Sequence, residues 1–199
     1  PAMLFALWAQ FKVNSAYAGA QKLPAASGFS GAEAAARILA AQGLRRVNIE
    51  PVGGYLSDHY DPQTKTLRLS QEVYFGRSLA ALGIAAHEAG HAMQDASGYA
   101  PLAIRNGIVP LAAVGSNLSF LLIFIGFMVG SLGLALFGIA LFSLVVIFQL
   151  VNLPVEYNAS NRAKDLLLRS GIIAPGESRA VARVLDAAAL TYVAATLSA

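Results

Sequence analysis

Cysteine is absent from this chain of 199 residues, and histidine occurs only at His59, His87 and His91. Without cysteine the protein forms neither disulfides nor thiolate metal sites, so a tightly bound transition metal would need histidine, aspartate or glutamate ligands. The net charge is only +3, and the basic residues are scattered without aromatic residues between them. These features predict that the protein has no nucleic-acid partner.

Charge is also missing from one long stretch. No Lys, Arg, Asp, Glu or His occurs between Asn106 and Val151. The stretch is long enough for two membrane spans of about 20 residues each, because the hydrocarbon core of a bilayer is about 30 Å thick. The sequence therefore predicts a transmembrane helical hairpin over residues 102–152, with its turn near Met128–Gly133. A buried hairpin in a soluble all-α protein is the alternative, but soluble core helices rarely lack charge for this long.

A hairpin returns the chain to the side of the membrane from which it came. All 14 Lys and Arg residues lie outside 106–151 and occur on both flanks of the hairpin. Positively charged flanks are typical of the cytoplasmic side, so we expect the polar parts of the chain there. Residues 1–14 are apolar up to Lys12 and too short to cross a bilayer, and they predict part of a first transmembrane helix.

Helical patterns lie on both sides of the predicted hairpin. In residues 30–43, Ser30 and Glu33 form the pattern of a capping box, and Gly43 marks the end of the helix. Apolar residues spaced three and four apart predict one long helix over 70–98. The last predicted helix would pack on the domain or on the bilayer surface. The helices expected after the hairpin cover 156–171 and 175–199.

Between the first two helices, alternating apolar and polar residues predict strands. These strands lie in 45–52, 55–60 and 65–70, and the turn signals "GG" and "DPQT" separate them, so a short antiparallel sheet is expected. Residues 15–101 would then form an α+β domain that the helices of 153–199 complete. The expected fold class is a mainly α membrane protein that has a small α+β domain and an inserted transmembrane helical hairpin.

The stretch "AAHEAGHAMQ", residues 85–94, carries the candidate chemistry. On a helix, His87 and His91 project from one face and can bind the same metal ion, and Glu88 can reach a water molecule on that ion. This is the HExxH pattern of zinc peptidases, in which zinc lowers the pKa of its water to about 7 and the glutamate takes the proton. Gly90 would spare room beside the metal. The alternative is two surface histidines with an incidental glutamate.

A catalytic zinc site needs a third protein ligand. Glu156 follows the second predicted span and would return to the same side of the membrane as the HExxH helix. A carboxylate just past a span is costly unless it is paired or bound to a metal, and Pro154 would bend the helix and let the carboxylate face inward. His59 is the other candidate ligand, and Glu156 is favoured over it.

Longer stretches of the chain resemble a known family. The HExxH helix followed by Asn152, Glu156 and Ala159 is similar to the HtpX-like and prenyl-protease membrane gluzincins. The stretches "LSDHYDPQTKTLRLSQEVYFGRSLAALGIAAHEAGHAMQ", "GYAPLAIRN" and "QLVNLPVEYNASNRA" resemble the YugP-like membrane zinc metallopeptidases still more closely, and with "LWAQFKVNSAY" and "SGFSGAEAAARIL" the resemblance covers nearly the whole chain.

This resemblance implies a zincin-type catalytic domain in an integral membrane protease. It implies zinc held by His87, His91 and Glu156, with Glu88 as the general base. The chain departs from the HtpX-like pattern at Ser160, where those proteins usually have Asp. We therefore expect that an amide side chain orients a ligand instead. The candidates are Asn152, Asn158 and Asn161.

Other residues are weaker candidates for contact with the substrate or the transition state. His59, Tyr157 or Arg162 could donate a hydrogen bond to the developing oxyanion. For His59, a local bond in a turn beside acidic residues is the alternative, and for Arg162 it is a contact with lipid headgroups. An edge of the predicted sheet could pair with an extended substrate.

The sequence thus predicts a membrane-embedded, zinc-dependent endopeptidase that hydrolyses peptide bonds at the cytoplasmic face of a bacterial plasma membrane. Zn²⁺ is the expected cofactor, and the expected partners are a protein or peptide substrate, the lipid bilayer and other copies of the chain in a homo-oligomer. One alternative is a non-catalytic membrane scaffold or chaperone with a structural zinc site closed by His59. Another is a small-solute membrane protein whose hairpins associate through Gly126, Gly130 and Gly133.

Overall fold

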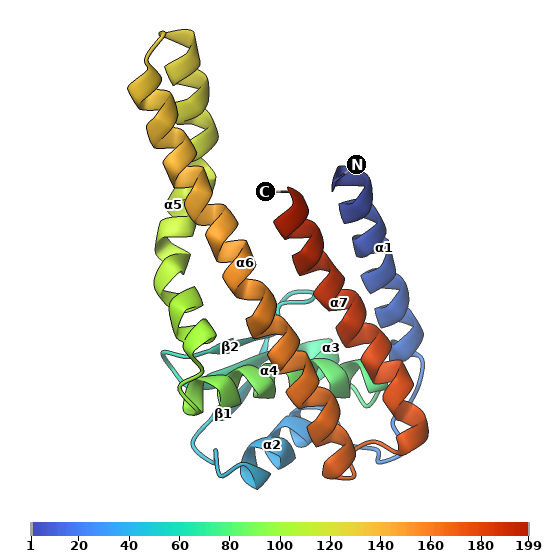
Figure 1. The fold of residues 1–199 in the computed structure, drawn as a ribbon. Helices are drawn as coiled ribbons and strands as arrows, with labels where there is room; N and C mark the ends of the chain where they lie inside the picture. The colour runs from blue at the N-terminus through green and yellow to red at the C-terminus, as the bar shows by residue number, and fades with distance from the viewer. Residues whose placement is uncertain (1, 199) are drawn as a thin grey trace.

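Long helices dominate the fold, and a small sheet lies at one end of them. The computed structural model describes residues 2–198; Pro1 and Ala199, at the outer ends of the predicted segments 1–14 and 153–199, lie outside the described residues. The shorter helix α4 runs across the lower part of the long upright helices, close to α2 and the sheet (Figure 1). The upright helices are α1 (Ala2–Gln21), α5 (Ala100–Met128), α6 (Leu132–Arg169) and α7 (Ser178–Ser198). The others are α2 (Gly31–Ala41), α3 (Gln71–Tyr74), α4 (Leu79–Ala96) and the 3₁₀ turn η1 (Pro175–Glu177).

Three helical stretches are long and apolar enough to cross a membrane. They are α5, α6 and Pro175–Ser198, which contains α7. Residues 2–14, expected to be part of a first transmembrane helix, are helical and belong to α1. In the described part of the chain, however, α1 does not meet the criteria for a span. The last helix, expected on the domain or the bilayer surface, packs against α1 and α6 and is also apolar enough to be a span.

Helices α5 and α6 pack closely against each other, and residues 129–131 join them. A Cβ added at Gly126 would lie 2.5 Å from the backbone nitrogen of Ala135, so only glycine allows this approach of the two backbones. Gly130 occupies the turn with a φ of +67°, a conformation that other residues rarely adopt. Two of the three glycines considered for association between hairpins therefore serve the packing of α5 and α6 within one chain.

The sheet is mixed, so the prediction of an antiparallel meander is wrong in part. Its order is β1-β3-β2, with β1 (Asn48–Val52) parallel to β3 (Thr66–Ser70) and β2 (His59–Asp61) antiparallel to it. Leu67 and Leu69 of β3 are fully buried, which favours the central position for this strand. Pro51 lacks an N–H group and can satisfy a ladder on only one side, which places β1 at an edge.

The single helix predicted over 70–98 is also wrong, because it is broken after α3. The backbone around the break pairs with another segment: Ala25 N donates to Arg77 O, and Leu79 N donates to Leu23 O, each across 2.9 Å. Ser78 then starts α4 by accepting a hydrogen bond from Ala81 N across 3.2 Å. The capping box of α2 is present as predicted, with Ser30 and Glu33 each bonding the backbone of the other.

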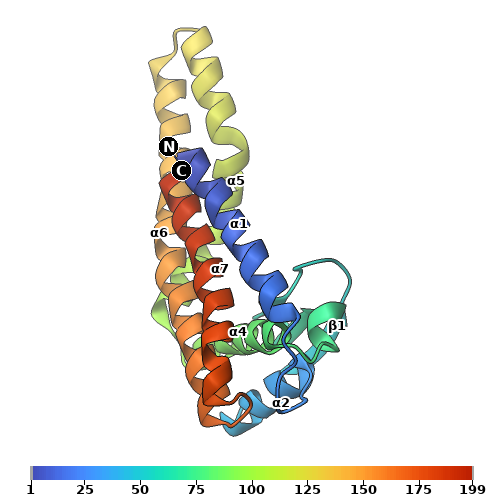
Figure 2. The same ribbon diagram turned by 90° about the vertical axis from the view of Figure 1, so that its right-hand side faces the viewer.

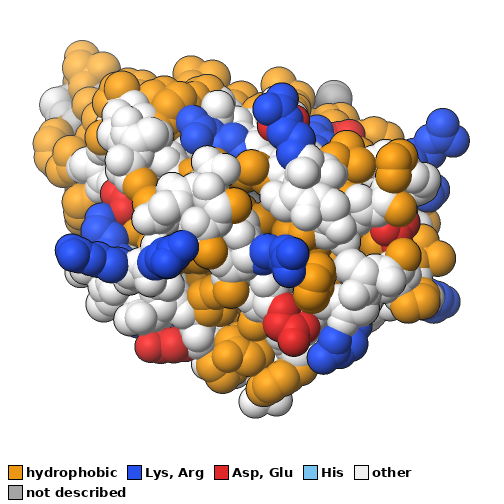
Figure 3. Space-filling view, turned by 90° about the horizontal axis from the view of Figure 1, so that it is seen from below, with side chains coloured by type: hydrophobic (Ala, Val, Ile, Leu, Met, Phe, Trp, Pro, Cys, Tyr) orange, Lys and Arg blue, Asp and Glu red, His pale blue; other side chains and the backbone are white. Residues whose placement is uncertain are grey.

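Charge gathers at the end of the molecule away from the α5–α6 turn. Seen from below, this end presents Lys and Arg side chains across its face, with Asp and Glu among them (Figure 3). Helices α1 and α7 lie side by side, and both chain ends lie beside the hairpin rather than at the charged end (Figure 2). The molecule is thus apolar in its upper half and polar where α4 and the sheet lie.

Candidate metal centre

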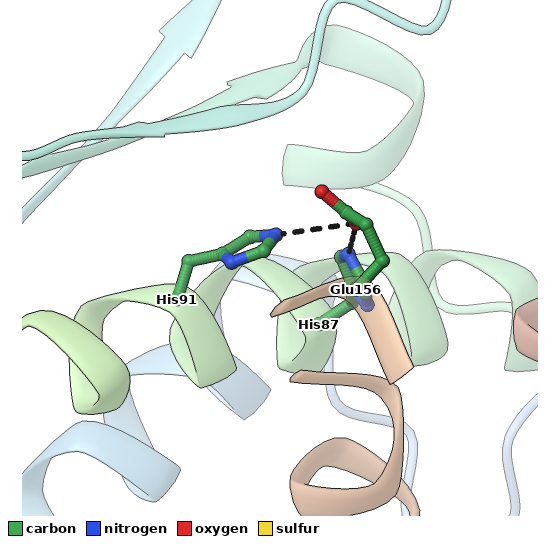
Figure 4. A group of neighbouring side chains, drawn as sticks. All are labelled: His87, His91 and Glu156. Atoms are coloured by element: carbon green, nitrogen blue, oxygen red, sulfur yellow. Dashed lines mark hydrogen bonds and ion pairs between the residues drawn. The ribbon is translucent and has the colours of Figure 1, made fainter. Parts of the chain in front are cut away.

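Two helices bring together three potential metal ligands. His87 and His91 project from α4, and Glu156 projects from α6 toward both rings (Figure 4). The Glu156 Oε2 atom lies 3.2 Å from His87 Nε2 and 3.6 Å from His91 Nε2. All three ligand atoms lie within 4.8 Å of one another. The side chains are largely buried, so water competes little for these atoms.

A glycine permits this convergence. A Cβ added at Gly90 would lie 2.8 Å from the carbonyl oxygen of Ala159, so α4 and α6 could not approach as closely with any other residue there. Gly90 therefore faces the backbone of α6, whereas the sequence suggested that it spares room beside the metal. Ala159 is itself fully buried in this contact. The small residues of the two helices thus set how near Glu156 comes to the histidines.

A chain of hydrogen bonds fixes the proton on His91. The Gln94 amide nitrogen donates to Val155 O across 2.8 Å and to Asn158 Oδ1 across 3.0 Å, which leaves Gln94 Oε1 to face His91 Nδ1 at 2.9 Å. An amide oxygen only accepts, so His91 Nδ1 carries the proton. The lone pair of His91 is then on Nε2, the atom that faces Glu156.

His87 is oriented by Ser160, the residue that stands where the HtpX-like pattern has Asp. Ser160 Oγ lies 3.1 Å from His87 Nδ1 and is placed to accept its proton, which leaves Nε2 for the metal. Of the three asparagines considered, only Asn158 acts on a ligand, through Gln94. Asn152 is buried with its Oδ1 unpartnered, and Asn161 is exposed.

The donor set fits a zinc ion. Two neutral imidazole nitrogens and one carboxylate are the ligands of many catalytic zinc sites, in which a fourth position stays open. Burial lowers the pKa of His91, but the nearby carboxylates of Glu156 and Glu88 outweigh burial and raise that pKa above its ordinary value. The same negative charge attracts a divalent cation.

Glu88 lies between two cavities beside the three ligands. An apolar cavity of about 240 Å³ extends toward α1 and α7, and a polar cavity of about 140 Å³ extends toward β2 and α5. Glu88 is buried and lines both cavities together with His87 and Glu156. Its carboxylate accepts no hydrogen bond from residues 2–198, so it can serve as a base for a molecule in either cavity.

The weaker candidates from the sequence lie in different places. His59 lines the polar cavity but is outside the group of three ligands, and its Nδ1 lies 2.8 Å from Ser57 O. Tyr157 lines a separate cleft between α1 and α7. Arg162 donates to Asn158 Oδ1 across 2.8 Å, so it supports the chain of bonds to His91 and does not face the ligands directly.

Three residues at the site were not among the candidates drawn from the sequence. Tyr192 of α7 and Asp58 line both cavities, and Arg105 of α5 lines the polar one. Asp58 accepts hydrogen bonds from the backbone and hydroxyl of Ser70, at 2.8 Å and 3.1 Å. Burial raises the pKa of Asp58 above its ordinary value, against the opposing effect of the Ser70 bonds. No spacing rule connects these residues with the HExxH helix, so only the fold reveals them.

The lengths of the helices indicate the depth of the site. Glu156 follows Leu132, the first residue of α6, by 24 residues, which is about 36 Å along a helix. Arg105 precedes Met128, the last residue of α5, by 23 residues, or about 35 Å. Both distances slightly exceed the hydrocarbon thickness of about 30 Å. If the α5–α6 turn reaches one surface of a bilayer, the site lies at the opposite surface.

Comparisons with known proteins agree with this chemistry. The model of a family described as "Putative neutral zinc metallopeptidase" matches residues 1–199. The chain is similar to "Putative membrane protease YugP" of Bacillus subtilis (strain 168), with 49% identity over 196 residues, which are 98% of this chain and 87% of that protein. No solved structure matches the chain significantly.

Proposed function

Because the chain belongs to the family described as "Putative neutral zinc metallopeptidase", we propose that it is a membrane-embedded, zinc-dependent endopeptidase. The observation that carries this proposal is the convergence of His87, His91 and Glu156, whose ligand atoms lie within 4.8 Å of one another beside the carboxylate of Glu88. The zincin-type catalytic domain is part of the same proposal.

The metal would be held by His87 Nε2, His91 Nε2 and the carboxylate of Glu156. When bound, zinc supplies a Lewis acid that polarises a peptide carbonyl and lowers the pKa of a water molecule to about 7. Ser160 and Gln94 hold the two imidazoles in the tautomer that presents Nε2. The ligands thus keep their orientation through contacts outside the group of three.

Glu88 is the proposed general base. Its carboxylate takes one proton from the attacking water as the water oxygen bonds to the carbonyl carbon. The carbon–nitrogen bond of the peptide then breaks, and Glu88 returns the proton to the leaving amine. The buried position of Glu88 between the two cavities supports this role, because a peptide that fills both must pass over it.

Tyr192 is the proposed donor to the developing oxyanion. It lines both cavities with His87, Glu88 and Glu156, and its hydroxyl is a neutral donor at the pH of the cytoplasm. A donor aimed at the negative charge of a tetrahedral transition state stabilises that state more than the substrate. Tyr192 therefore replaces Tyr157 and Arg162 in this role, while His59 could contact substrate in the polar cavity.

The proposed location is the plasma membrane of a bacterium, with α5 and α6 inserted as a hairpin and the catalytic domain in the cytoplasm. The basic residues on both flanks of the hairpin and the charged lower face support this orientation. A structural zinc site would need a fourth ligand. His59, the obvious candidate, lies outside the ligand group, which favours an open catalytic site over a closed structural one.

The proposal is tested by metal analysis and proteolysis with purified protein in detergent. We expect about one zinc per chain and cleavage of casein by the wild type. Glu88→Gln should retain the zinc and lose cleavage, because it removes only the base. Glu50→Gln, which changes an exposed carboxylate on β1 that lines neither cavity, is the matched control and should cleave normally. Normal cleavage by Glu88→Gln would refute the mechanism.

A further inference from the structure

The polar cavity contains a guanidinium group without a partner. Arg105 lines this cavity together with Glu88, His87 and His91. Its Nε atom is buried and makes no hydrogen bond, and its guanidinium forms no ion pair with any acidic residue in the described part of the chain. Buried polar groups nearly always have partners, and those that lack one in the protein alone call for an explanation.

The carboxylates on the same cavity do not supply that partner. Asp58 is bonded to Ser70, and Glu156 faces the two histidines. Glu88 has to remain free if it acts as the base. A guanidinium presents a planar fork of donors that fits a carboxylate with two parallel hydrogen bonds. The vacant donors of Arg105 therefore match a carboxylate that comes from outside the chain.

The size of the polar cavity fits such a group. A cavity needs about 10–15 Å³ to hold one water molecule, and this cavity has about 140 Å³. Several water molecules, or one small carboxylate with some water, can occupy it. Leu102 is the one aliphatic side chain on its wall, and the other lining residues are polar, aromatic or proline. An apolar side chain of a substrate would find little contact there.

The other cavity has the opposite character. Its wall includes Val13, Leu56, Ile84, Val184 and Leu185, and it has about 240 Å³. The two cavities share Asp58, His87, Glu88, Glu156 and Tyr192, so they meet at the ligands. A chain bound across the ligands would present an apolar side chain on one side and a polar group on the other.

We propose that Arg105 binds a carboxylate of the substrate, and that the site selects peptides with this carboxylate on one side of the scissile bond and an apolar side chain on the other. The carboxylate comes either from an acidic side chain or from the free C-terminus of the peptide. This inference rests on the proposed function, because it names the substrate class of the same site.

Peptide binding tests the inference without requiring turnover. Zinc-loaded Glu88→Gln protein in detergent micelles is titrated with fluorescent Leu-containing peptides that differ only in Glu against Gln, or in a free against an amidated C-terminus. Charge-assisted hydrogen bonds are worth more than neutral ones, so we expect about 10-fold tighter binding of the carboxylate form in one of the two pairs. The pair that shows the preference identifies the source of the carboxylate.

Variants of Arg105 in the same background assign the preference. Arg105→Gln should reduce the difference within that pair to less than about 2-fold, and Arg105→Lys should keep part of it, because lysine has the charge without the fork. Arg169→Gln is the matched control, since Arg169 is exposed and pairs with Asp165 on the far part of α6. It should retain the full preference. Zinc content, measured on every variant, reports whether the site is intact.

The outcomes separate this inference from the proposed function. Equal binding of carboxylate and amide forms by zinc-loaded protein overturns the role of Arg105, even if the wild type cleaves casein. A preference that persists in Arg105→Gln also overturns it. Conversely, a wild type that binds zinc and prefers carboxylate peptides but cleaves nothing contradicts the peptidase and leaves the binding role of Arg105 supported.

Discussion

Gln94 accepts a hydrogen bond from His91 Nδ1 across 2.9 Å, while its own amide group donates to α6 at Val155 and Asn158. One buried side chain thus ties the second histidine of the motif to the helix that carries Glu156. Both the tautomer of His91 and the position of α6 depend on it.

Gln94→Leu should therefore weaken zinc binding. Leucine fills a similar volume but offers no acceptor, and losing such a partner of a metal-binding histidine typically costs about 10- to 100-fold in metal affinity. Competition with a chelating dye measures the affinity. Gln63→Leu, at an exposed turn, is the control and should bind zinc as the wild type does. Equal affinities for the two variants would contradict the role of Gln94.

The third ligand is tested by comparing two substitutions. Glu156→Ala should lose most of the bound zinc, since two histidines alone form a weak site, whereas His59→Ala should keep it because His59 lies outside the ligand group. Metal analysis after dialysis gives the zinc content of each variant. Full zinc in Glu156→Ala would disprove the ligand assignment.

Removal of one hydroxyl group tests the transition-state donor. Tyr192→Phe should lower kcat by about 10²- to 10³-fold, the usual effect of losing one oxyanion donor, with the zinc content unchanged. Tyr157→Phe removes the same group from the α1–α7 cleft and should leave kcat as it is. A small effect at Tyr192, or an equal one at Tyr157, would argue for a different donor.

Substitution of Gly90 by alanine tests whether the close contact between α4 and α6 is needed for zinc binding. Gly90→Ala places a Cβ only 2.8 Å from the Ala159 carbonyl oxygen, and overpacking of this kind costs about 1–3 kcal/mol. We expect a lower melting temperature and a loss of zinc, because the helices must separate. Gly133→Ala, where a Cβ meets open space, should change neither property. Retention of zinc by Gly90→Ala at wild-type affinity would show that the helices can adjust.

The stabilisation that the β2–β3 hairpin beside the polar cavity gives to the fold should depend on pH. Hydrogen bonds from Arg68, and then from Thr64 and Gln63, lower the pKa of Asp61 below its ordinary value. A lowered pKa in the folded state contributes stability that is complete above the unfolded value of about 3.9 and is lost as the pH falls through the folded value. Asp61→Asn should thus melt below the wild type at pH 7, and the two should converge toward pH 2. A constant difference would contradict the linkage.

The sequence predicts best those features that are encoded locally. The capping box of Ser30 and Glu33 and the HExxH spacing require only neighbouring residues, and both are present in the structure. The sheet order was missed because it depends on which strand takes the centre, and Leu67 and Leu69 decide this through burial in the finished core. The break before α4 was missed for a similar reason, since it depends on the backbone of residues 23–25.

The sequence did not predict the site residues that only the fold brings to the metal ligands. Tyr192 lies on α7, far along the chain from the motif. Arg105 is close to the motif in the sequence, but only the packing of α5 shows that it lines the same cavity. Ser160 was set aside because a carboxylate was expected there, yet a hydroxyl at 3.1 Å serves as acceptor for His87. Glu156 was found because it follows a long uncharged stretch, where a lone carboxylate is expensive.

Helix α6 is continuous from Leu132 to Arg169, with Pro154 inside it, so one helix contains both an arm of the hairpin and the third ligand. The two histidines, by contrast, are fixed to α4, which crosses α6. Tilting is one way in which membrane-spanning helices adjust to bilayers of different thickness, and a tilt of α6 would carry Glu156 sideways relative to the two imidazoles. We therefore expect the thickness of the surrounding membrane to influence the geometry of the ligand group.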